Sequence, residues 1–143
     1  LSSVPVLAVE GGASRLPQNA IAGIDFSPFS LEAARAACRL VGPDGVVRLV
    51  HVAATAGARP DASTVAEVLR QAAEPSPECP DADMVVLEGD PARELVSFAS
   101  DHDHDLIAVG SHGRSFIDRL LLGSVSTTIL RAASCSVLVV PPA

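Results

Sequence analysis

From residue 21 onward, short apolar runs alternate with longer segments of helical character, and this alternation constrains the fold more than any other feature. Runs that are almost wholly apolar are typical of strands buried on both faces of a parallel sheet. Five strands are expected, at residues 21–26, 46–52, 84–88, 106–110 and 137–140. The pattern therefore predicts an α/β fold, a doubly wound five-stranded parallel sheet with helices on both faces.

Four helices are expected between these strands, and local signals mark where three of them start. Ser27 and Asp90 each place a capping side chain directly before a proline at the first helical position. Thr64, followed by Glu67, forms a capping box for the second helix. The expected helices cover about residues 28–40, 64–73, 91–101 and 124–133.

Composition and charge exclude several classes of protein. The 143 residues, 48% of them hydrophobic, suit one compact domain that needs neither disulfides nor a structural metal. A formal net charge of −7 argues against a nucleic-acid partner, because surfaces of that kind neutralise phosphates with Lys and Arg. Lysine is absent, which excludes P-loop and Schiff-base chemistry. No apolar run reaches the roughly 20 residues of a membrane span, so we expect no membrane partner.

The three cysteines, Cys38, Cys79 and Cys135, are widely separated and odd in number, which fits neither a disulfide framework nor a zinc site. We expect three reduced thiols in a cytoplasmic protein. Cys38 falls on the apolar side of the first helix and is expected in the core. Cys79 falls in an acidic, proline-rich segment and is the thiol that we expect to be exposed.

Residues 1–19 are interpreted as an N-terminal strand and linker, ahead of the domain at residues 20–143. Residues 3–9 are similar to residues 135–140, the closing strand of that domain. Two interpretations stay open: the segment is the tail of a preceding tandem domain, or it is an ordinary edge strand. We expect it to lie beside the strand at 137–140, whose apolar edge also predicts a homodimer.

The segment that carries chemistry begins at the end of the fourth expected strand. Gly110 and Gly113 let the backbone turn sharply and approach a ligand without a Cβ in the way. Gly123 and Ser124 lie where the fourth helix begins, so free N–H groups and the positive end of the helix dipole face outward. With the hydroxyls of Ser124 and Ser126 as further donors, these turns predict a cradle for oxyanions, most naturally a polyphosphate.

At these residues the sequence resembles the ATP-binding branch of the universal stress protein family. Residues 109–114 (Val-Gly-Ser-His-Gly-Arg) and 121–126 (Leu-Leu-Gly-Ser-Val-Ser) are similar to the family's ATP-binding motif at every glycine and at the serine. Residues 25–27 and 50–52 resemble the ends of its first two strands, and the likeness covers residues 21–141. The resemblance implies a Rossmann-like sheet of strand order 3-2-1-4-5, with the ligand across the carboxyl ends of strands one and four.

The resemblance also implies a ligand and the residues that hold it. The ligand is an adenine nucleotide, ATP or alternatively AMP or cyclic AMP, with Mg²⁺ or Mn²⁺ carried on the phosphates. Asp25 meets the ribose hydroxyls, the backbone of Val52 reads the adenine edge and Gly110 borders the ribose. The other implied residues hold the phosphates or lie in the intervening loop: His112, Gly113, Arg114, Gly123, Ser124, Val125 and Ser126. Gly23 replaces a larger residue of the family and is expected to loosen one wall.

Several candidate residues also have a purely structural interpretation. Asp25 can cap the first helix beside Ser27, and His51 fits a satisfied imidazole in an apolar strand. His102 and His104 alternate with aspartates at a helix end, which fits a solvated terminus better than a metal site.

No catalytic residue is assigned, because no acid is spaced to orient His112 as a general base. We therefore expect a stress-response protein that binds ATP with at most weak hydrolysis. One alternative is a dimerisation module of the same fold with an empty cradle. Another is an adenylyl-transfer or phosphatase-type enzyme.

Overall fold

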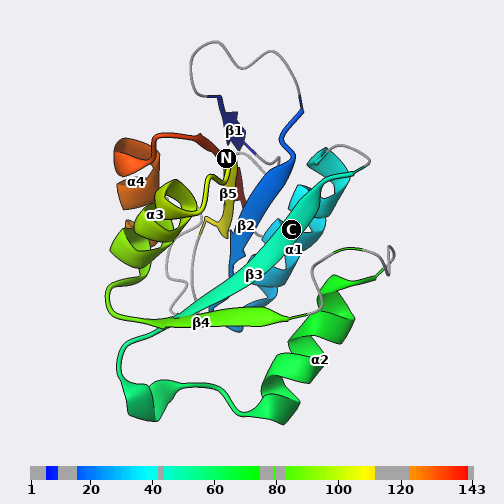
Figure 1. The fold of residues 1–143 in the computed structure, drawn as a ribbon, viewed down its shortest axis with the longest axis vertical. Helices are drawn as coiled ribbons and strands as arrows, with labels where there is room; N and C mark the ends of the chain where they lie inside the picture. Colours follow the sequence, from blue (N-terminus) through cyan, green and yellow to red (C-terminus); the bar gives the residue numbers. More distant parts are fainter. Residues whose placement is uncertain are drawn as a thin grey trace.

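A six-stranded sheet forms the middle of the protein, with helices on both of its faces (Figure 1). The computed structural model describes residues 6–9, 16–41, 44–74, 79, 83–111 and 123–141. Its strands are β1 (Val6–Ala8), β2 (Asn19–Gly23), β3 (Val46–Ala53), β4 (Met84–Glu88), β5 (Leu106–Gly110) and β6 (Ser136–Val140). Its helices are α1 (Pro28–Leu40), the 3-10 helix η1 (Ala56–Ala58), α2 (Ala62–Ala72), α3 (Pro91–Asp101) and α4 (Ser124–Ala132).

The strands follow the order β1-β6-β5-β2-β3-β4 across the sheet. Each neighbouring pair from β6 to β4 is parallel, which confirms the doubly wound fold and the order 3-2-1-4-5 for the five expected strands. β1 adds a sixth strand that is antiparallel to β6, so the prediction of a purely parallel sheet is wrong at this edge. β1 lies beside β6 as predicted, and it occupies the edge that we expected a second subunit to cover.

Two apolar layers fill the space between the sheet and the helices. On one face, α1 and α2 pack small side chains such as Ala33, Ala37 and Val68 against the strands. On the other face, α3 and α4 contribute larger side chains, among them Leu95 and Ile129. Successive strand residues point to opposite faces, so β2, β5 and β6 supply both layers. The sequence prediction of helices on both faces is confirmed.

Side chains cap three of the helices, and one cap differs from the prediction. Ser27 accepts from the amide of Ser30 at the start of α1, and Asp90 caps α3, as predicted. α2 begins before Thr64, because the carboxylate of Asp61 accepts from the amide of Thr64 at 2.8 Å. The prediction of a capping box at Thr64 is therefore wrong. Thr64 lies inside the first turn of α2, and the carboxylate of Asp61 caps the helix.

Two of the three cysteines form a disulfide. Cys38 on α1 is bonded to Cys79, with a Cα–Cα distance of 6.0 Å, and Cys135 is not part of this bond. The prediction of three reduced thiols is wrong for this pair, and so is the prediction that Cys79 is an exposed thiol. Cys79 is half-buried because it packs against the apolar layer of α1 and α2.

No helix within the described ranges combines the length and the apolar character that a membrane span requires.

Candidate functional site

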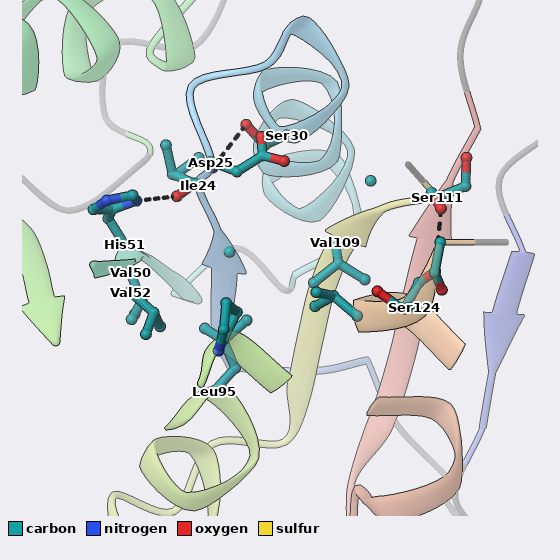
Figure 2. A pocket seen from close by; sticks show the side chains of 16 residues that line it. Ile24, Asp25, Ser30, Val50, His51, Val52, Leu95, Val109, Ser111 and Ser124 are labelled. Carbon is teal, nitrogen blue, oxygen red and sulfur yellow. Dashed lines mark hydrogen bonds between the residues drawn. The ribbon is translucent and has the colours of Figure 1, made fainter. Parts of the chain in front are cut away.

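A cavity of about 420 Å³ opens at the carboxyl ends of β2, β3 and β5 (Figure 2). β2 pairs with β3 on one side and with β5 on the other, so the chain connections diverge at this point of the sheet. A crevice at such a switch point is where ligands bind in open α/β sheets. The lining residues are Gly23, Ile24, Asp25, Ser30, Val50, His51, Val52, Pro91, Leu95, Val109, Gly110, Ser111, Gly123, Ser124, Val125 and Ser126.

Most of the predicted site residues come together in this cavity. The lining includes Asp25, Val52, Gly110, Gly123, Ser124, Val125 and Ser126. The predicted residues His112, Gly113 and Arg114 lie outside the described residues. Sequence reasoning missed Ser30, Leu95 and Ser111, because a position in a helix or after a strand does not by itself show which side chain faces a cavity.

The turn from β2 into α1 places Asp25 at the cavity. Its Oδ1 accepts from the amide of Ser27 at 2.9 Å and from the hydroxyl of the same residue. The hydroxyl of Ser30 accepts from the amide of Asp25 and donates to the carbonyl of Ser27. Asp25 Oδ2 has no hydrogen-bond partner among the described residues. Asp25 therefore braces the start of α1 with one oxygen and keeps the other available to a ligand.

Phe26 and His51 support this turn from one side. Phe26 has a φ of +65°, a left-handed conformation that a bulky residue rarely adopts. Its ring lies 4.6 Å from that of His51, and His51 Nδ1 lies 2.6 Å from the carbonyl oxygen of Ile24. Because a carbonyl oxygen only accepts, Nδ1 is assigned as the protonated donor. The interpretation of His51 as a satisfied imidazole is confirmed, but its ring lines the cavity and is only half-buried.

On the opposite side, some predicted phosphate donors are already engaged. The amide of Gly123 donates to the carbonyl of Ser111. The buried hydroxyl of Ser126 lies within bonding distance of two carbonyl oxygens, those of Ser111 and Gly123. The expectation that these two groups face a ligand is wrong. They instead join the end of β5 to the start of α4, which fixes the position of that helix end.

The first turn of α4 keeps its remaining amides free of protein partners in the described part of the chain. Its N-cap is Gly123, which has no side chain to accept from them, whereas side chains cap α1, α2 and α3. The amides of Ser124, Val125 and Ser126 cannot bond within the helix, and all three residues line the cavity. Together with the positive end of the helix dipole, these N–H groups make this side of the cavity suited to an anion.

The rest of the lining is largely apolar. Leu95 from α3 and Val109 from β5 both line the cavity (Figure 2). Both side chains also lie next to Gly23, the last residue of β2. A Cβ on Gly23 would lie 2.9 Å from Leu95 Cδ1 and 3.3 Å from Val109 Cγ1. Gly23 therefore does not loosen the wall as expected, since Leu95 occupies the space next to it. The cavity thus combines one anion-binding end with a wall suited to a flat apolar ring.

The two histidines at the end of α3 form a separate cluster. His102 stacks on Phe98 with ring centroids 4.2 Å apart, and its Nδ1 lies 3.0 Å from the Phe98 carbonyl oxygen. Burial lowers the pKa of His104 below its ordinary value, and the charge of Arg48 acts in the same direction. No group of three or more His, Cys, Asp and Glu residues in the described segments could hold a metal ion.

Comparison with known sequences places these features in a family. The universal stress protein family matches residues 17–141. The universal stress protein Rv2005c of Mycobacterium tuberculosis is 35% identical over 138 residues, covering 86% of this chain and 46% of that protein. The universal stress protein MJ0531 of Methanocaldococcus jannaschii is 47% identical over 55 residues, covering 38% and 32%. The chain therefore spans about a third to a half of the length of these relatives.

Solved structures agree with this match. A universal stress protein in complex with cAMP aligns with a TM-score of 0.63 and 26% identity, covering 88% of this chain and 98% of that one. A universal stress protein from Archaeoglobus fulgidus aligns with a TM-score of 0.70 and 20% identity. It covers 98% of this chain and 50% of the solved one, and at this identity it supports the fold alone.

Proposed function

We propose that this chain, which belongs to the universal stress protein family, binds an adenine nucleotide in the cavity between β2, β5 and α4. The observation that carries the proposal is the uncapped first turn of α4, whose free amides border a largely apolar cavity at the switch point of the sheet. Phosphate suits the amides and a purine ring suits the apolar wall. A family member crystallised with cAMP supports the same ligand class.

In this proposal different residues contact the phosphate, the ribose and the base of the nucleotide. The amides of Ser124 and Val125 hold phosphate, and the hydroxyl of Ser124 adds a donor. The free oxygen of Asp25 accepts from the ribose hydroxyls, next to Gly110. The backbone of Val52 meets the edge of the base. Gly113, with its neighbours His112 and Arg114, is proposed to complete the phosphate side.

A divalent cation fits this arrangement as a companion of the phosphates. Asp25 is the single carboxylate among the described lining residues. Mg²⁺ and Mn²⁺ prefer oxygen ligands, and Mg²⁺ keeps several waters when it is bound through phosphates. We propose that the nucleotide carries the ion into the cavity.

The residues that line the cavity favour nucleotide binding without efficient hydrolysis. The chain has no lysine to neutralise a transferred phosphate, and His51 Nδ1 is engaged with the carbonyl of Ile24. Bound nucleotide would then change the stability or the partners of the protein instead of fuelling a reaction. The proposed role is a regulatory module of the stress response.

A thermal-shift titration with ATP, AMP, cAMP and GTP tests the proposal. A ligand that binds only the folded state stabilises it by about 2.7 kcal/mol at a hundredfold excess over Kd. We expect the adenine nucleotides to raise the melting temperature and GTP to raise it less. If none of the four shifts the melting temperature at millimolar concentration, the proposal is wrong. Rapid phosphate release would favour an enzyme.

A further inference from the structure

The peptide group directly before Asp25 is held at both of its ends by side chains. Its carbonyl oxygen, which belongs to Ile24, lies 2.6 Å from Nδ1 of His51 on β3. Its N–H, which belongs to Asp25, donates to the hydroxyl of Ser30 on α1 at 3.3 Å. Both hydrogen bonds are drawn in Figure 2. A strand on one side and a helix on the other therefore set the orientation of this peptide group.

The two ends of this peptide group lie in buried surroundings. Ile24 is 3% exposed and Ser30 is 2% exposed. The hydroxyl of Ser30 also donates to the carbonyl of Ser27 at 2.9 Å, so its proton is engaged and its lone pair is left for the amide of Asp25. A buried carbonyl or amide that loses its partner is strongly unfavourable. We therefore expect the peptide group to shift if either side chain is lost.

The regular pairing of β2 ends immediately before this peptide group. The amide of Ile24 donates to the carbonyl of Val50 at 2.8 Å, which continues the pairing of β2 with β3 by one more bond. Two residues later, Phe26 has a φ of +65°, a conformation that persists at a bulky residue only where the surroundings hold it. The bonds from His51 and Ser30 hold the backbone between these two points.

We propose that His51 and Ser30 are positioning residues for ribose recognition. They fix the peptide group before Asp25, so that the free carboxylate oxygen of Asp25 meets the 2′ and 3′ hydroxyls of a bound nucleotide. The assignment rests on the proposed function and narrows its ligand class to ribonucleotides. His51 acts through the carbonyl of Ile24 and Ser30 through the amide of Asp25, so neither side chain needs to touch the nucleotide.

Selectivity for ribose follows from the directional nature of hydrogen bonds. Hydrogen bonds weaken steeply when the distance or the angle departs from the preferred geometry. Oδ1 of Asp25 accepts from the amide of Ser27 at 2.9 Å, so the carboxylate moves together with the turn. A shift of the peptide group would move Oδ2 away from the ribose but leave the amides of α4 in place. Contacts with the ribose would weaken, whereas contacts with the phosphates would remain.

Calorimetric titration with ATP and with 2′,3′-dideoxy-ATP tests the assignment through the ratio of the two Kd values. In the parent chain we expect ATP to bind roughly tenfold or more tightly, because the dideoxy nucleotide lacks the hydroxyls that bond to a carboxylate. His51→Phe keeps a ring beside Phe26 and removes the donor, and Ser30→Ala removes the acceptor for the amide of Asp25. Each should reduce the preference for ATP by roughly threefold or more. A variant that only destabilises the fold would weaken both nucleotides alike.

Controls separate the two hydrogen bonds from packing. His51→Asn loses the ring but keeps an N–H donor near the position of Nδ1, so it should preserve more of the preference for ATP than His51→Phe does. Ser63→Ala removes an exposed hydroxyl that donates to the capping Asp61 of α2, and Ser63 does not line the cavity, so the preference should not change. In the parent chain, NMR of the ring nitrogens at mildly alkaline pH should show the proton of His51 on Nδ1.

The results that would overturn the assignment differ from a failure of nucleotide binding. An unchanged preference in folded His51→Phe and Ser30→Ala would mean that these side chains do not position Asp25, while nucleotide binding stands. Equal binding of both nucleotides to the parent chain would mean that Asp25 does not read the ribose. An unprotonated Nδ1 of His51 would remove the bond to Ile24, and this measurement decides the outcome if the variants do not fold. If the parent chain binds neither nucleotide, the proposed function and this assignment are both wrong.

Discussion

The turn at Asp25, Phe26 and Ser27 shows how single residues prepare the site. The left-handed conformation of Phe26 costs on the order of 1–3 kcal/mol. Its ring contact with His51 and the bonds from Ser27 to Asp25 help to hold it in place. Sequence reasoning identified Ser27 by its capping chemistry, and the family resemblance pointed to Asp25. It could not anticipate the role of Phe26, because a positive φ at a bulky residue leaves no signal in composition or periodicity.

Gly23→Ala tests whether the close packing beside β2 sets the size of the cavity. The new methyl group would lie 2.9 Å from Leu95 Cδ1, so Leu95 is expected to move toward the cavity. We expect nucleotide binding to weaken by about 1 kcal/mol, roughly a fivefold rise in Kd, measured by calorimetry. Gly57→Ala is the matched control, because its Cβ would meet only Thr55 Oγ1, at 3.9 Å. An unchanged Kd for Gly23→Ala would show that Leu95 does not limit the space.

At the scale of elements, periodicity and helix-start signals predicted the strands and helices well. The bounds of β4 and β5 match the prediction, and the caps of α1 and α3 are the predicted residues. The errors of prediction occur where the local sequence pattern suggests one partner for a residue and the folded chain provides another. Asp61 caps α2 in place of Thr64, and Cys79 bonds to Cys38 although the two are 41 positions apart in sequence.

The disulfide between α1 and Cys79 should contribute measurably to stability. Cross-linking two distant residues restricts the unfolded chain, and a typical contribution is about 2–4 kcal/mol. We expect the double variant Cys38→Ser, Cys79→Ser to unfold at lower urea concentration than the parent chain under non-reducing conditions. Cys135→Ser, which leaves this disulfide intact, is the control. Equal midpoints for parent and double variant, without reductant, would mean that the bond does not stabilise the fold.

The end of α3 predicts a pH dependence of stability. Burial, aided by Arg48, lowers the pKa of His104 from its ordinary value of 6.5. As the pH falls below about 6.5, the unfolded chain therefore binds more protons than the folded chain, and stability decreases until the pH passes the folded pKa. Urea unfolding of the parent chain and of His104→Gln between neutral and mildly acidic pH measures this contribution. We expect a smaller decrease in the variant; the same decrease in both would contradict the assignment.

At the scale of the whole molecule, the fold and part of the site followed from sequence. Periodicity predicted the alternating α/β layers, whereas the strand order came from the family resemblance. The glycine and serine pattern located the start of α4. It did not show that the amide of Gly123 and the hydroxyl of Ser126 bond within the protein. Those bonds depend on how β5 and α4 meet in space. The interpretation of residues 1–19 as the tail of a tandem domain stays a prediction.

The central claim is that free amides in the first turn of α4 bind the phosphates of an adenine nucleotide. Ser124→Pro removes one of these amides, and proline is compatible with the first helical position after Gly123, whose backbone is extended. Ser124→Ala is the matched control, because it removes the same hydroxyl and keeps the amide. Calorimetric titration with ATP should give a Kd roughly tenfold or more higher for Ser124→Pro than for Ser124→Ala. Equal affinities in two folded variants would contradict the claim.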